Sequence, residues 1–188
     1  MSPFGAIMAI KLSTLSIGLG LFMTAVNLFG LLKPSEFKNA VRKLPRSVPL
    51  GYVFMLSATA WFMWNVKSES LSDFESLKPY LFTLFIAVGV GSCFFVQDFL
   101  AVRGLAVLML LLGKLMVDTE RWVETDWRWV IAVWAYLLVL AGMWFTVSPW
   151  RLRDLLYWAT ANEKRIRFGS ALRFAFGVFV AFLGFKVF

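Results

Sequence analysis

The sequence contains no histidine, a single cysteine and no acidic residue well inside its long apolar runs. Without histidine, the commonest metal ligand and the commonest general base near neutral pH are both missing. The single cysteine, Cys93, excludes an intramolecular disulfide. Pumps usually move protons and cations through membrane carboxylates, so their absence counts against a proton-coupled carrier.

The usual catalytic and cofactor-binding motifs are also missing. We find no Walker A loop, no dinucleotide fingerprint, no CxxC pair and no nucleophile elbow. We therefore predict a protein that is not an enzyme and that binds no cofactor and no metal. An enzyme that acts on lipids is a third, weaker hypothesis that no motif supports.

Charged residues make up only 16% of the chain, whereas 60% is hydrophobic and 18% is aromatic. This composition is typical of an integral membrane protein. The formal net charge of +8 raises the question of nucleic acid, but the basic residues concentrate in two loops beside apolar segments. That distribution indicates the positive-inside rule, and it favours anionic lipid head groups over nucleic acid as the partner.

Six apolar segments are candidates for membrane spans, because a bilayer core needs roughly 20 apolar residues per helix. Four are uncharged, at 12–32, 47–66, 79–97 and 129–150. The segment Gly104–Val117 contains Lys114 and is short. The segment Phe168–Phe188 contains Arg173 near its beginning and Lys186 near its end, where the long side chains can extend their charges to the membrane surface. The prediction is a single membrane domain over 1–188 with six spans, or five if Gly104–Val117 is re-entrant. We expect 12–32 to be a retained span and not a signal peptide.

The loop charges orient these spans. Segments 33–48 and 151–167 carry net charges of +4 and +3, whereas 67–78 and 118–128 carry −1 and −2. The alternation fits six spans with 33–48, 98–103 and 151–167 in the cytoplasm of a bacterial-type inner membrane and both termini outside. Within 67–78, Ser72 and Glu75 have the spacing of a capping box.

Two basic segments, each beginning at a proline, resemble one another at a distance of 115 positions. Pro34 matches Pro149, and the apolar residues after each proline recur at the spacing of one helical face. We interpret each as an amphipathic elbow helix at the membrane surface. The fold class is then all-α, with three parallel-repeated hairpins at about 12–66, 79–117 and 129–188. The last hairpin resembles small bacterial inner-membrane hairpin proteins of unknown function, which implies no activity.

The basic residues of the two elbow regions are the candidate contacts for lipid phosphate or for a partner, although the orientation rule alone also explains them. They are Lys33, Lys38, Arg42, Lys43, Arg46, Arg151, Arg153, Lys164, Arg165 and Arg167.

Small and hydroxylated residues form a polar face on the first span, which indicates helix packing or a polar path. They are Ser13, Ser16, Gly20, Thr24 and Asn27. Small residues at four-residue spacing also occur in the third span, as Ala87 with Gly91 and as Gly89 with Cys93, and mark contacts within the fold or with a partner. Lys114 is either a functional intramembrane charge or a snorkelling lysine paired with Asp118.

The leading hypothesis is an accessory or structural subunit that binds lipid and packs against a larger membrane complex, with other membrane protein subunits as partners. The alternative is a small channel or transporter that uses the polar face of the first helix and Lys114.

Overall fold

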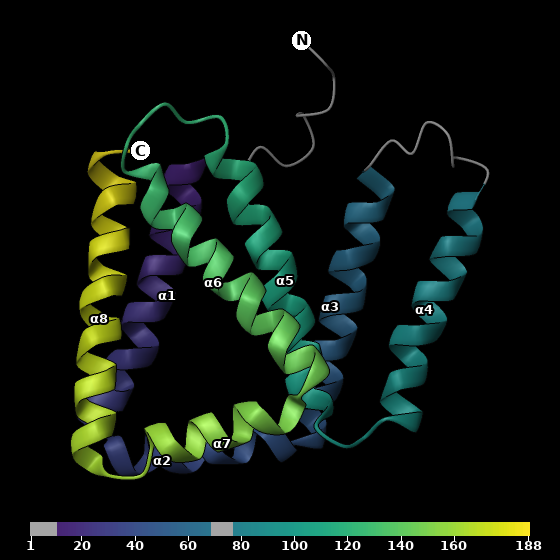
Figure 1. Ribbon diagram of the computed structural model, residues 1–188, viewed down its shortest axis with the longest axis horizontal. Coiled ribbons are helices and arrows are strands. Elements are labelled where there is room, and N and C mark those ends of the chain that lie inside the picture. The colour runs from purple at the N-terminus through teal and green to yellow at the C-terminus, as the bar shows by residue number, and fades with distance from the viewer. Residues whose placement is uncertain (1–10, 69–76) are drawn as a thin grey trace.

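The computed structural model describes residues 11–68 and 77–188, and within these ranges it contains helices and no strand (Figure 1). The capping box expected at Ser72–Glu75 lies outside the described residues. The helices, in chain order, are α1 (Leu12–Leu32), α2 (Pro34–Lys43), η2 (Leu44–Arg46), α3 (Val48–Ser68), α4 (Lys78–Phe95), α5 (Leu100–Glu120), α6 (Arg128–Val147), α7 (Pro149–Ala159) and α8 (Glu163–Lys186).

Within the described ranges, five helices are each long and apolar enough to cross a membrane, namely α1, α4, α5, α6 and α8. A sixth span results if α2, η2 and α3, which bend by 67°, count together. The multi-pass helical prediction is therefore confirmed. Gly104–Val117 lies within the unbroken helix α5, so the re-entrant alternative is wrong. The marginal span is instead α3, where Asn65 and two tryptophans interrupt the apolar sequence.

The long helices run between two ends of the molecule (Figure 1). At the lower end, α2 and α7 lie across the long helices, and Val96–Phe99 joins α4 to α5. We call this the elbow end. The opposite end, which we call the far end, contains the loop between α5 and α6, the first turn of α1 and the C-terminus. Both proline-led segments thus form short helices, as predicted, and they lie at the same end of the molecule.

The bends that lead into α2 and α7 have nearly the same geometry. The residue before each proline, Lys33 or Ser148, has φ −131°, with ψ 67° and 73°, respectively. Its backbone N–H donates to the carbonyl four residues back, of Phe29 or Trp144, at 2.9 and 2.8 Å. Each proline then occupies the first helical turn, where its missing N–H costs nothing. The nearly equal dihedral angles give the chain a similar bend between α1 and α2 and between α6 and α7.

Close packing joins the helices in two groups. The first seam lies between α1 and α8, where Gly20, Gly177 and Gly184 bring the two backbones together. The second group is centred on α5, which packs on both α3 and α6, with Gly104 against the backbone of α3 at Met55. Near the far end, α1, α5, α6 and α8 share one core around Met116 and Val180.

Helix α4 is the least covered span. It packs mainly on α3, where Gly89 lies against Thr59 and Cys93 is buried. Only 11% of the residues of α4 are buried, compared with 28–44% of the residues in the most apolar 18-residue stretch of each of the four other spans. One side of α4 therefore has no helix of this chain against it among the described residues.

Candidate functional site

The two elbow helices lie side by side, and Arg42 joins them. From α2 its Nε donates to Thr160 Oγ1 at 2.9 Å, and its Nη2 donates to the Thr160 carbonyl at 3.0 Å, just beyond the end of α7. The same guanidinium lies over the ring of Tyr157, 4.6 Å from its centroid. Arg42, one of the predicted contacts for lipid phosphate or a partner, therefore holds the two elbows together.

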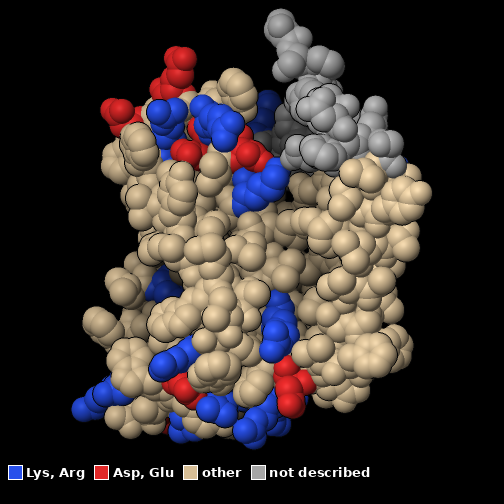
Figure 2. Space-filling model, turned by 45° about the vertical axis from the view of Figure 1, so that its right-hand side comes forward, with Lys and Arg blue, Asp and Glu red and all other residues tan. Residues whose placement is uncertain are grey.

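The other predicted basic residues lie at the elbow end, most of them exposed. Figure 2 shows Lys and Arg gathered there, a band with few charged residues above, and both signs of charge at the far end. Two of these residues have acidic neighbours: Lys33 pairs with Glu36 at 3.1 Å, and Arg153 pairs with Asp154 at 2.8 Å. Those that remain exposed without such an ion pair in the described ranges are Lys43, Arg46, Arg151, Lys164, Arg165 and Arg167.

The polar face of α1 lies in the seam with α8. Ser16, Gly20 and Asn27 are buried, and Ser13 and Thr24 are half-buried. Thr24 Oγ1 donates to the Gly20 carbonyl at 2.7 Å, so its hydroxyl bonds to its own helix. This is the arrangement that the packing interpretation describes, and it leaves most of the face covered by α8.

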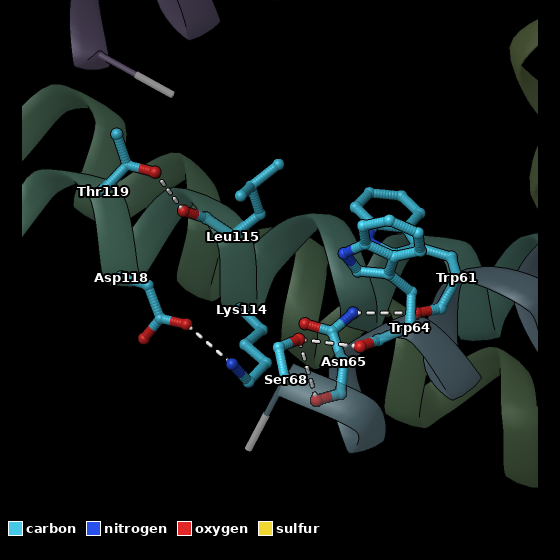
Figure 3. Close-up of polar contacts among 8 residues, drawn as sticks. All are labelled: Trp61, Trp64, Asn65, Ser68, Lys114, Leu115, Asp118 and Thr119. Carbon is cyan, nitrogen blue, oxygen red and sulfur yellow. Dashed lines mark hydrogen bonds and ion pairs between the residues drawn. The ribbon is translucent and has the colours of Figure 1, made fainter. Parts of the chain in front are cut away.

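Lys114 lies near the far end of α5, beside the last turn of α3 (Figure 3). Its Nζ lies 2.8 Å from Oδ2 of Asp118 one turn on, and both side chains are about half exposed. Around it, Asn65 and Ser68 donate to carbonyls of α3 itself. The pair has the geometry of a snorkelling lysine, and an exposed pair at this spacing is worth about 0.5 kcal/mol.

A groove opens between α6 and α8, which diverge from the far end toward the elbow end (Figure 1). The rings of Trp134 and Phe176, and of Trp127 and Phe179, meet edge to face across it near the far end. Its volume is about 790 Å³, with Met23 of α1 also lining it. Every lining residue is apolar or aromatic except Arg173.

A second hollow, of about 260 Å³, lies between α2, α7 and the beginning of α8. Arg165, Ser170 and Arg173 line it together with Phe37 and Thr160. The Ser170 hydroxyl is buried and has no hydrogen-bond partner among the described residues. Arg173 lines both hollows, so the cavity and the groove meet at this side chain.

Sequence reasoning missed this role of Arg173 because it placed the beginning of the last span at Phe168. Helix α8 begins at Glu163, so Arg173 lies about 15 Å along it. The signal was present in the sequence: Arg165, Gly169 and Arg173 follow at four-residue steps and share one side of a helix.

In the described ranges, no three His, Cys, Asp or Glu side chains come together as a metal site would require. No protein-family model, curated protein or solved structure matches this chain.

Proposed function

We propose that this chain is a non-catalytic accessory subunit of a bacterial-type inner membrane, which binds anionic lipid at its elbow end and packs against other membrane proteins. The observation that carries the subunit role is the uncovered side of α4. Gly89 and Cys93 pack toward α3, whereas Ala87 is exposed and a Cβ on Gly91 would meet only Phe95 at 4.0 Å. Small residues at this spacing let a second helix approach closely.

The orientation that we propose places the elbow end in the cytoplasm and both termini outside. Its support is the concentration of basic residues over α2 and α7, since basic residues near span ends are retained on the cytoplasmic side. Near an anionic leaflet, each exposed lysine or arginine contributes on the order of 1 kcal/mol of binding. The elbow end thus suits the inner leaflet.

We further propose that the chain repeats one hairpin three times in the same direction. The nearly equal angles at Lys33 and Ser148 support this, and Val96, where α4 ends, has a similar φ of −124° and ψ of 65°. In all three places a descending helix ends with one bend, and the next long helix ascends. The middle hairpin has no elbow helix and turns through Phe99, the one non-glycine residue with positive φ among those described.

Single-cysteine labelling tests the orientation. With Cys93 replaced by serine, Lys38→Cys and Arg153→Cys should both react with an impermeant maleimide from the cytoplasmic side of oriented membrane vesicles. Cysteine at Glu124, in the loop between α5 and α6, should react only from the other side. Labelling of positions 38 and 153 from opposite sides would contradict the orientation and the repeat together.

Purification in a mild detergent with mass spectrometry tests the subunit role. The wild-type chain should retain the same membrane proteins in fixed ratio, and Gly91→Ile should release them, because its side chain would occupy the space left for a partner helix. Gly18→Ile is the matched control, since a Cβ on Gly18 meets nothing within 4 Å and α4 stays unchanged. If both variants retain the same amount of the co-purifying proteins, or if both lose them, the result would count against this surface of α4 as the partner site.

The channel alternative makes a different prediction. The purified chain alone should then conduct ions or solutes in liposomes, and Lys114→Ala should alter the flux. Such conduction would overturn the subunit proposal.

A further inference from the structure

We propose that the α6–α8 groove and the cavity below it bind one anionic phospholipid, with an acyl chain in the groove and the phosphate at Arg173 and Arg165. The inference rests on the membrane setting proposed above, but not on the subunit role. It names the lipid class and the place where a single molecule of it is held.

The groove suits an acyl chain. It lies between two spans, it opens toward the side, and its lining is apolar from Trp129 to Leu137 on α6 and from Leu172 to Phe179 on α8, apart from Arg173. An acyl chain can cover this apolar surface without placing any polar group against it. The ring pairs Trp134–Phe176 and Trp127–Phe179 join the two sides of the groove near the far end.

Arg173 supplies the charge that selects an anion. Its Nη2 lies 4.0 Å from the position of a Cβ on Gly169, so the guanidinium extends toward the elbow end, where head groups lie. Within residues 11–68 and 77–188, no carboxylate pairs with it. A guanidinium at membrane depth requires an anion, and phosphate accepts two parallel hydrogen bonds from it.

The cavity adds polar groups below Arg173. Arg165 lies two turns earlier on the same side of α8, and the intervening Gly169 leaves the space between them open. Ser170 also lines the cavity, but its hydroxyl lies in the seam with α1, where a Cβ on Gly30 would come within 2.5 Å of it. Thr160 completes the wall, fixed in place by Arg42.

The test is native mass spectrometry of the full chain in detergent, titrated with phosphatidylglycerol or with zwitterionic phosphatidylcholine. We expect one phosphatidylglycerol to bind at least about tenfold more tightly than phosphatidylcholine, as one charge-assisted contact implies. Arg173→Gln should weaken phosphatidylglycerol by a similar factor. Arg151→Gln, which removes an exposed arginine of α7 that lines neither hollow, should not.

Gly169→Leu provides a second, independent test. Because a Cβ there meets only the tip of Arg173, the helix should fold, while the larger side chain fills the space for the head group. We expect loss of phosphatidylglycerol binding with an unchanged melting temperature, and Gly18→Leu should retain binding. If Gly169→Leu unfolds, Arg173→Gln decides alone.

Three results would overturn the inference: undiminished phosphatidylglycerol binding to Arg173→Gln, equal binding of the two lipids, or displacement of the lipid by inorganic phosphate at equal concentration. The chain is assayed alone in detergent, so missing partner proteins or a reversed orientation would not change the outcome. The failure of this site and the failure of the proposed function are therefore separate results.

Discussion

Gly20→Ala should destabilise the protein by about 3 kcal/mol, because the added methyl group has no space in the seam between α1 and α8. The new Cβ would lie 2.5 Å from the backbone nitrogen of Ala181 and 2.7 Å from the carbonyl oxygen of Gly177. Both are backbone atoms, so no side-chain rotation relieves the clash. The two helices must separate, and the seam extends from Gly177 to Gly184. Unfolding in mixed micelles of mild detergent and SDS, followed by tryptophan fluorescence, measures the change.

Gly18→Ala is the matched control on the same helix, two positions earlier. A Cβ at Gly18 meets nothing within 4 Å, so the substitution should change stability by less than about 1 kcal/mol, with a favourable sign from helix propensity. Equal effects of the two alanines would mean that α1 and α8 do not approach as closely as described.

The parts of the fold that depend on a single segment could be predicted from the sequence. Hydropathy along the chain identified the spans, and the prolines at 34 and 149 identified two short helices. These features are local, because a run of apolar residues or a missing N–H acts within its own helix. Even so, α3 was judged a clean span from its lack of charge, although Asn65 and its tryptophans make it marginal.

Features that depend on two segments could not be predicted. The polar face from Ser13 to Asn27 indicates a contact, and so do the small residues Gly177, Ala181 and Gly184 of the last span. The sequence does not pair these two faces, which lie more than 150 residues apart and meet in the seam between α1 and α8. Arg42 looked like every other elbow cation, and its inward direction depends on where Thr160 lies. The place of Arg173 along its helix could not be predicted either, because hydropathy does not show that α8 already begins at Glu163, within the basic region.

Cys93 should react with a thiol reagent at least about tenfold faster in Gly104→Ala than in the wild type, because the substitution forces α3 away from α5. A Cβ on Gly104 would lie 2.7 Å from the Met55 nitrogen and 2.9 Å from the Phe54 carbonyl carbon, again backbone atoms. Cys93 is 4% exposed and packs in one cluster with Met55 and Leu100, so it reports on this seam. The rate of N-ethylmaleimide addition in mild detergent, followed by mass spectrometry, is the measurement.

Two controls distinguish an effect on the α3–α5 seam from an effect on the α1–α8 seam. Gly91→Ala, on α4 itself, places its methyl group 4.0 Å from Phe95 alone and should leave the Cys93 rate unchanged. Gly20→Ala should lower global stability while it accelerates Cys93 less than Gly104→Ala does, since α1 and α8 lie outside the Cys93 cluster. Because α4 packs mainly on α3, separation of α3 from α5 would loosen both helices from the rest of the molecule. Equal Cys93 rates in all three variants would mean instead that α3, α4 and α5 do not share a seam at Gly104.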